Sequence, residues 1–405
     1  MPIPKHKYVP QLLLLFVLCS SLAHAGSFYS RYGYGLLRSH DGVKATAMGG
    51  VGIAITDSVS IFYLNPASLA TFNTTHIQGE FLYDRANLTL GNTTAKFHDS
   101  NVNGLGILLP VKRGYSVAFG IQPYSQVDYE FSDKVESGDK PYTQSLLGSG
   151  GLDNFYFAFG GTVGPVRVGV ASDFYFGLVR RTWRVNFVTA NLVDTEDQTS
   201  THFKGIGFHG GLQTTIKRWQ LGVALGAPVS LTAETQREFV FSSIDSTPLP
   251  PAQFDAALPL WYGLSAAYQA GPKWLFAAQY RAQQWSDLNT TELLGASGVD
   301  SYNLGFGLQF TPSFDRLQGN IGRIHYRAGA TLSRLPYAEA NGKTVSEWTA
   351  TAGFGLPFNR GDSRLDFAFE YGQRGSADNL SEEKIFRFSA SVIGSERWFQ
   401  RSGKR

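Results

Sequence analysis

The sequence predicts an all-β protein, an antiparallel transmembrane β-barrel of about 14 strands with an N-terminal plug inside its lumen. Three observations predict this fold. The 405 residues include 45 Gly and are 14% aromatic but only 17% charged, which disfavours both a helical globule and a disordered chain. From about residue 75, apolar residues alternate with small or polar ones, as in strands. Beyond the start of the chain, no run reaches the roughly 20 apolar residues of a membrane-spanning helix.

The first element, residues 1–25, is expected to be a secretory signal peptide. Lys5 and Lys7 form its basic start, a short apolar core follows, and Ala23-His24-Ala25 is a small-x-small cleavage site. Cleavage there also removes Cys19, the only cysteine. The mature chain then needs no disulfide chemistry. Its charge is nearly balanced, which gives no indication of a nucleic-acid partner.

The second element, residues 26–74, does not alternate and is expected to form a compact hatch inside the barrel. It contains the small apolar stretch that begins Met48-Gly49-Gly50, then Asp57, then the triplet Asn65-Pro66-Ala67. Pro66 excludes a regular helix or central strand through that point. The Asn65 side chain can close a turn by bonding to nearby backbone. The lumen of such a wide barrel is not filled by wall side chains, so this segment would fit inside.

The third element, residues 75–399, contains the strands. In each alternating segment one face is bulky and apolar, while the other is mostly Gly, Ser, Ala, Gln and Thr. A soluble β-sandwich would instead charge its outer face, so we expect the bulky face in lipid and the small face toward the lumen. Fourteen strands are expected at 75–87, 101–110, 114–130, 151–163, 166–188, 200–216, 219–240, 256–270, 273–286, 299–312, 322–334, 344–357, 363–374 and 384–399.

The connections between these strands alternate between short turns and longer polar segments. Short turns on one rim and long loops on the other are typical of barrels in the outer membrane of Gram-negative cells, which is the predicted location. Aromatic residues, including Tyr115, Trp219, Trp274 and Phe358, lie beside the predicted periplasmic turns, as in an interfacial girdle. Residues 400–405 are expected to be a short basic tail.

Charged side chains on the inward face allow two interpretations. One is an ion-pair network that holds the hatch in place through Asp57. The other is that an arginine binds the carboxylate of an amphipathic ligand, because a guanidinium suits that geometry. The inward-facing residues predicted by the alternation are Arg167, Asp173, Arg281, His325, Arg327, Asp366, Glu370 and Arg387, of which the arginines Arg167, Arg281, Arg327 and Arg387 are the ligand-binding candidates.

Two motifs carry little weight. Gly205 to Gly210 matches a dinucleotide-binding fingerprint but lies inside an alternating strand with no helix after it. His98-Asp99-Ser100-Asn101 is similar to the His-x-Ser-Asn arrangement of outer-membrane phospholipases, but it is expected at the end of an external loop instead of at the lipid-facing wall. We therefore expect no enzyme, no cofactor and no metal site.

Residues 42–70, with their small residues, Asp57 and the Asn65-Pro66-Ala67 triplet, resemble the hatch of the FadL/TodX family of outer-membrane transporters of hydrophobic compounds. The fourteen predicted strands agree with this resemblance. It implies hydrophobic ligands in the lumen and lateral exit through a gap made by a kink in the third strand. Pro123 interrupts that strand and removes a ladder donor, so it is the candidate lateral gate. The external loops are shorter than in the family archetype.

The sequence therefore predicts a monomeric, passive outer-membrane channel for hydrophobic small molecules such as long-chain fatty acids. One alternative is a structural or secretion-accessory barrel of the same fold that transports nothing. A second alternative is an outer-membrane phospholipase. A continuous apolar cavity between hatch and wall is the feature expected of a channel and not of a scaffold.

Overall fold

The computed structural model describes residues 26–38, 41–91, 93–136, 141–187, 192–241, 244–288, 298–313, 320–339, 341–376 and 378–396. The predicted signal peptide and the basic tail lie outside these residues. Within the described residues, no helix combines the length and the hydropathy of a membrane span.

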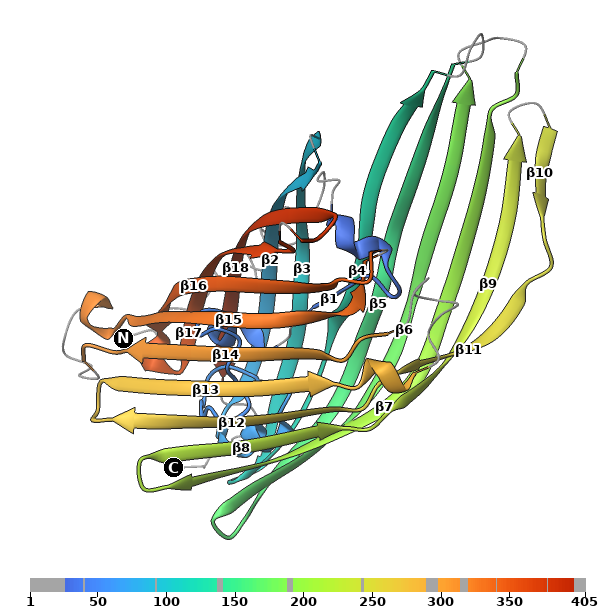
Figure 1. Cartoon of the computed structure of the whole chain (residues 1–405). Coiled ribbons are helices and arrows are strands. Elements are labelled where there is room, and N and C mark those ends of the chain that lie inside the picture. The colour runs from blue at the N-terminus through green and yellow to red at the C-terminus, as the bar shows by residue number, and fades with distance from the viewer. Residues whose placement is uncertain are drawn as a thin grey trace, which may run out of the picture.

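The long elements are all strands, and they form one closed antiparallel barrel of 14 strands (Figure 1). The barrel closes where the last strand pairs with the first, from Glu396 opposite Thr75 to Ser381 opposite Leu90. Two of the barrel strands are interrupted, one consisting of β8 and β9 and another of β10 to β12. The strands are β2 (Thr75–Leu90), β3 (Thr93–Lys112), β4 (Tyr115–Val135), β5 (Tyr142–Val163), β6 (Val166–Phe187), β7 (Thr195–Ile216), β8 (Trp219–Gly226), β9 (Val229–Phe241), β10 (Ile244–Pro248), β11 (Ala252–Leu258), β12 (Trp261–Ala270), β13 (Trp274–Gln283), β14 (Ser301–Phe310), β15 (His325–Ala338), β16 (Thr344–Phe358), β17 (Ser363–Arg374) and β18 (Ser381–Glu396).

The predicted fold class is confirmed, and the main difference concerns the loop rim, the end of the barrel opposite the short turns. The segments 88–100 and 131–150 were expected to be long loops, but β2, β3, β4 and β5 extend through most of them. These segments lack a consistently apolar face, so hydrophobic alternation does not reveal them. Backbone pairing continues there all the same, and in Figure 1 strands β5 to β9 rise well beyond β12 to β15.

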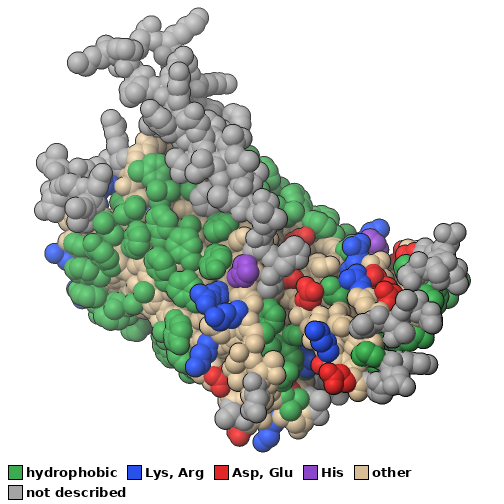
Figure 2. All heavy atoms as spheres, turned by 90° about the horizontal axis from the view of Figure 1, so that it is seen from above, with side chains coloured by type: hydrophobic (Ala, Val, Ile, Leu, Met, Phe, Trp, Pro, Cys, Tyr) green, Lys and Arg blue, Asp and Glu red, His purple; other side chains and the backbone are tan. Residues whose placement is uncertain are grey.

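The bulky face of the wall points outward, as predicted. Phe276 and Phe306 are 47% and 50% exposed, although they belong to the most apolar runs of the sequence. Hydrophobic side chains cover a wide area of the barrel's outer surface (Figure 2). Such a surface is suited to contact with lipid and not with water.

Residues 26–72 lie against the inward face of the wall. Their elements are η1 (Phe28–Arg31), β1 (Leu36–Leu37), α2 (Gly42–Thr46) and η2 (Pro66–Thr71), the blue segment enclosed by strands in Figure 1. A short 3₁₀ helix starts at Pro66, and no regular helix or strand runs through this residue. Proline is well tolerated in a first helical turn.

Inward-facing glycines allow this segment to approach the wall closely. A Cβ on Gly307 of β14 would lie 2.4 Å from the Met48 carbonyl oxygen, and one on Gly329 of β15 would lie 2.3 Å from the Gly49 nitrogen. Gly49 itself has a φ of +66°, which favours glycine. The small inward face that the sequence displays is therefore the packing surface for the N-terminal segment.

Strands β3 and β4 separate part-way along their length (Figure 1). Their pairing runs from Lys112 opposite Tyr115 to Leu105 opposite Ile121 and goes no further. Beyond that point β1 occupies the free edge of β4, with Leu37 opposite Ser125. On its other edge, β4 shows a register shift between Pro123 and Ser125. The wall is thus irregular at the position where Pro123 interrupts the third strand.

Candidate functional site

A cavity of about 190 Å³ lies in the lumen between the N-terminal segment and the wall. Most of its apolar lining is aromatic or leucine, and its polar lining includes several arginines. The apolar lining residues are Leu36, Leu37, Tyr63, Leu64, Leu82, Tyr124, Tyr175, Trp261, Tyr302, Leu335 and Pro336, and the arginines are Arg38, Arg281, Arg334, Arg374 and Arg387.

The four predicted ligand-binding arginines differ in how far their charges are neutralised. Arg327 is buried against Asp366, with 2.6 Å between Nη1 and Oδ1. Arg387 lies 3.2 Å from Asp84 and 3.3 Å from Glu347. These two arginines are therefore committed to carboxylates of the protein.

Arg167 and Arg281 form no ion pair with a carboxylate among the described residues. Arg167 donates to the hydroxyl groups of Thr56 and Thr215 and lies away from the cavity. Arg281, on β13, lines the cavity and has no hydrogen bond or ion pair to any residue that the structure describes. The nearest opposing charge is the buried carboxylate of Asp41, the residue before α2, which interacts electrostatically with Arg281 without forming an ion pair. Of the four candidates, Arg281 is therefore the one that lines the cavity without a hydrogen bond or ion pair among the described residues.

A first ion-pair network joins the N-terminal segment to the wall near the turn rim. Asp57 accepts hydrogen bonds from Lys44 and Arg364, each at 2.8 Å, and Arg364 also pairs with Asp366 at 2.8 Å. Burial alone would raise the pKa of Asp57, but Arg364 and Lys44 outweigh it and hold that pKa well below its ordinary value. Burial lowers the pKa of Lys44 to about 8 despite Asp57.

Asp57 thus forms ion pairs with both the N-terminal segment and the wall, and its wall partner Arg364 was not predicted. Arg364 is absent from the inward-facing residues predicted above. The signal was present, because Arg364 and Asp366 are two positions apart on one strand and so share a face.

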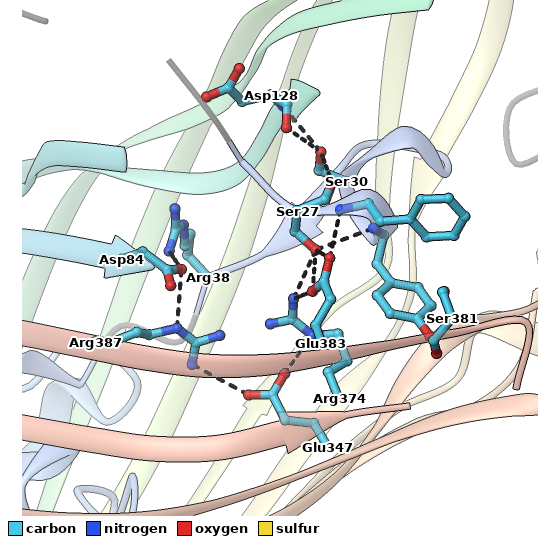
Figure 3. Close-up of polar contacts among 12 residues, drawn as sticks. Ser27, Ser30, Arg38, Asp84, Asp128, Glu347, Arg374, Ser381, Glu383 and Arg387 are labelled. Carbon is cyan, nitrogen blue, oxygen red and sulfur yellow. Dashed lines mark hydrogen bonds and ion pairs between the residues drawn. The ribbon is translucent and has the colours of Figure 1, made fainter. Parts of the chain in front are cut away.

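A second network fixes residues 27–38 near the loop rim (Figure 3). It runs through six alternating charges that sequence reasoning largely missed. Its ion pairs, in order, are Glu383–Arg374 at 2.7 Å, Arg374–Glu347 at 2.7 Å, Glu347–Arg387 at 3.3 Å, Arg387–Asp84 at 3.2 Å and Asp84–Arg38 at 3.4 Å. At its end, Glu383 accepts hydrogen bonds from the Ser27 hydroxyl at 2.7 Å and the Phe28 backbone N–H at 2.6 Å.

Asn65 both closes a turn and ties that turn to the wall. Its Oδ1 accepts from the Ala67 backbone N–H at 3.1 Å, which caps the first turn of η2. Its Nδ2 donates to the carbonyl oxygens of Ile53 at 2.8 Å and of Leu212, on β7, at 3.2 Å. The side chain is completely buried, and its bonds to Ile53 and Ala67 are buried as well.

Gly49 and Gly50, in the small apolar stretch of the N-terminal segment, are also held by side chains of the wall. The Gly49 N–H donates to the Thr351 hydroxyl at 3.2 Å, and the Gly50 carbonyl accepts from the Gln279 amide at 2.9 Å. Wall side chains on β13 and β16 thereby satisfy backbone groups of a segment that has little secondary structure of its own.

A second cavity, of about 550 Å³, lies where β3 and β4 separate. Pro123 lines it, as do Asp99, Asn101 and Val102 of β3. Arg38 and Leu82 line this lateral cavity and also the lumen cavity. Arg38 donates to Gln126 of β4 and lies 3.5 Å from Asp99 of β3, so it spans the separation between the two strands.

The phospholipase-like motif is not where it was expected, because it lies within β3 and not in an external loop. His98 is exposed on the outward face, whereas Asp99 is buried on the inward face. Strand alternation places Ser100 on the outward face with His98. Asn101 donates to Asp99 at 2.8 Å and so belongs to the inward side. Within the described structure, the three residues of the motif therefore do not converge on one site.

Comparison with known families assigns the chain. A family model named BamG matches residues 5–403. The chain belongs to the BamG family. No curated protein sequence matches this BamG-family chain.

Solved structures share the fold. The CymD monoaromatic hydrocarbon channel is 16% identical with a TM-score of 0.59, and covers 93% of this chain and 100% of its own. A Pseudomonas aeruginosa FadL homologue is 12% identical with a TM-score of 0.62, covering 88% and 99%. The toluene transporter TodX from P. putida is 14% identical with a TM-score of 0.57, covering 91% and 100%. The predicted resemblance to FadL/TodX proteins is thus confirmed for the fold of this BamG-family barrel.

Proposed function

We propose that this BamG-family barrel is a passive outer-membrane channel that binds small hydrophobic compounds in its lumen and releases them sideways through the wall. One observation carries the proposal: the lumen cavity and the lateral cavity between β3 and β4 share Arg38 and Leu82 as lining residues. In this proposal residues 26–74 are the hatch, Pro123 belongs to the lateral gate, and the loop rim faces the cell exterior. The channel activity named for CymD and TodX supports the proposal by analogy of fold.

The size of the lumen cavity favours a compact ligand. An apolar cavity of about 150 Å³ is enough to hold benzene, whereas sites for larger ligands span roughly 300–1,000 Å³. At about 190 Å³, the lumen cavity accommodates a single ring with a small substituent. A long-chain fatty acid, which the family resemblance suggested, would have to extend outside it.

The chemistry of the lining favours a ligand with one carboxylate. Arg281 supplies a guanidinium without a hydrogen bond or ion pair in the described structure, with Asp41 as the carboxylate that acts on it electrostatically. Tyr63, Tyr124 and Trp261 also line the cavity and supply aromatic surface. A guanidinium can hold a carboxylate through two parallel hydrogen bonds. We therefore propose small aromatic acids as preferred ligands, with neutral aromatics as weaker ones.

The first prediction tests this with benzoate and toluene. Arg281→Gln is expected to weaken benzoate binding to the purified barrel roughly 10- to 100-fold, because a hydrogen bond to a charged group contributes about 1.5–3 kcal/mol. Toluene binding should change by less than about threefold. Isothermal titration measures both affinities, and flux into proteoliposomes measures passage.

Arg167→Gln is the matched control, since Arg167 is another inward-facing arginine without an ion pair but lies outside the cavity. It should leave both affinities unchanged. Equal benzoate affinity in Arg281→Gln and the unaltered protein would exclude the proposed role of Arg281.

A non-transporting structural or secretion-accessory barrel is the second candidate. The observation that favours it is the double anchoring of the N-terminal segment, by Asp57 at one end and Glu383 at the other. In that case the unaltered barrel passes neither benzoate nor toluene into liposomes, although heat-dependent gel mobility shows that it is folded.

A further inference from the structure

A group of basic side chains lies on the outward face of the barrel, outside the lumen cavity and the lateral cavity. Arg85 of β2, Lys96 and His98 of β3, and Lys384 of β18 form this group, here called the basic outer patch. All four are exposed. No hydrogen bond or ion pair joins any of the four side chains to the residues that the structure describes.

Strand register brings the four residues together. Lys384 lies opposite Asn87, which lies opposite Lys96, so these two lysines flank one position of β2. In the next row, Phe386 lies opposite Arg85, which lies opposite His98. Adjacent antiparallel strands are about 5 Å apart, so the patch is roughly 10 Å wide. That width suits one or two phosphate groups.

The acidic side chains of the same strands point the other way. Asp84, Asp99 and Glu383 are on the inward faces of β2, β3 and β18, where they pair with Arg38, Arg387 and Arg374. On the outward face, Glu382 lies one row nearer the loop rim, and Glu130 of β4 lines a cavity together with Lys96. The rows of Arg85 and Lys384 contain no carboxylate on β17, β18, β2 or β3, so the patch keeps an excess of positive charge.

The patch lies at the level where lipid headgroups are expected. Phe386 and Tyr371, paired across β17 and β18 in the row of Arg85, are 41% and 54% exposed on the outward face. Exposed aromatic residues on a barrel mark the boundary between the acyl chains and the headgroups. Below this row the outward face continues with Phe388, Tyr83 and Phe81 toward the turn rim. Arginine and lysine next to such a boundary extend toward the headgroups.

We propose that the basic outer patch binds the phosphate groups of a phosphorylated glycolipid in the outer leaflet. The guanidinium and ammonium groups match phosphate oxygens. The patch is continuous with the apolar band, so the acyl chains of such a lipid lie on the wall while its phosphates meet the cations. A free phosphate ion gains nothing from that band. This inference does not depend on whether the barrel transports anything.

The test removes the charge and keeps the size of the side chains. The triple variant Arg85→Gln, Lys96→Gln, Lys384→Gln is titrated in detergent with diphosphoryl lipid A and with the same lipid after removal of its phosphates. Native mass spectrometry counts the bound lipids. The matched control is Lys217→Gln, Arg218→Gln, Lys273→Gln, which removes three exposed cations from turns on the opposite rim.

The unaltered barrel and the turn-rim control are expected to bind diphosphoryl lipid A equally. The patch variant should bind it roughly a hundredfold more weakly, because each Lys or Arg near an anionic surface contributes about 1 kcal/mol. A second variant, Arg85→Lys, should retain most of the affinity, since it keeps the charge. Heat-dependent gel mobility shows that all variants are folded barrels.

Three results would overturn the proposal. The patch variant could bind as well as the unaltered barrel, or the dephosphorylated lipid could bind as well as the phosphorylated one. Inorganic phosphate could also displace the lipid at equal phosphate concentration, which would make the patch a site for the free ion.

Discussion

Asn65 shows how single side chains hold the N-terminal segment. It makes three hydrogen bonds, to Ala67, Ile53 and Leu212, and so links one turn to a neighbouring loop and to β7. The first two of these bonds are buried. Losing a buried hydrogen bond costs about 1–3 kcal/mol. The strand pairing that closes the wall is independent of these bonds.

The second prediction follows from that separation. Asn65→Ala should leave assembly and heat resistance of the barrel intact, while it loosens the hatch and raises the passage of small hydrophilic dyes into proteoliposomes. The control is Asn87→Ala, which removes an asparagine from the exposed outward face of β2. A barrel that fails to assemble, or dye passage equal to that of the control, would contradict the hatch role and leave Asn65 as a turn residue only.

For contacts between the N-terminal segment and the wall, the sequence indicates the residue in the segment more readily than its partner in the wall. Asp57 and Asn65 stand out in the sequence because they interrupt a small, apolar, Gly-rich stretch. Their partners do not, since Arg364 is 307 positions from Asp57 and Leu212 is 147 positions from Asn65. Only the closed barrel decides which wall residue faces which part of the segment.

At the scale of the element, hydrophobic alternation predicted strand bounds accurately where the outward face is apolar, here called the lipid band. It predicted them poorly between this band and the loop rim. The strand at 363–374 matches β17 at both ends, because its aromatic residues alternate without interruption. By contrast, β5 begins at Tyr142 and not near residue 151. Above the band both faces of a strand meet water, so the hydrophobic pattern fades while the backbone ladder continues.

The third prediction concerns the break in β4. Proline removes a backbone donor, and pairing of β4 with β3 ends at Ile121, two residues before Pro123. Pro123→Val should let the pairing continue further and slow the uptake of toluene into proteoliposomes. Pro110→Val is the control, because Pro110 lies in β3 near the turn rim, also beside a register shift. If Pro123→Val takes up toluene as fast as the unaltered barrel, the proposal of a lateral gate at this position is wrong.

At the scale of the whole molecule, the N-terminal segment connects the two cavities. Asp57 of this segment pairs with Arg364 of the wall, and Phe28, near its start, donates to Glu383 of the wall. Between these two residues in the chain, β1 lies along the free edge of β4. Arg38, which directly follows β1, borders both cavities. We therefore expect that a ligand passing from the lumen cavity to the lateral cavity requires this part of the segment to move.

The fourth prediction therefore fixes β1 to β4 and asks whether passage stops. Leu37 and Ser125 are directly opposite in the register, and such antiparallel pairs lie about 4.5–5.5 Å apart between Cα atoms, which suits a disulfide. The single native cysteine, Cys19, belongs to the predicted signal peptide. The variant with Leu37→Cys and Ser125→Cys should take up toluene slowly when oxidised, and uptake should recover on reduction.

The control is the variant with Ser132→Cys and Ser145→Cys. These two residues are a directly opposite pair of β4 and β5, so their disulfide joins two wall strands without touching the segment. If the oxidised Leu37–Ser125 variant takes up toluene as fast as its reduced form, β1 is not a gate even though the barrel is a channel. If neither form nor the unaltered barrel takes up toluene, the channel function itself fails, because the reduced form leaves every proposed path open.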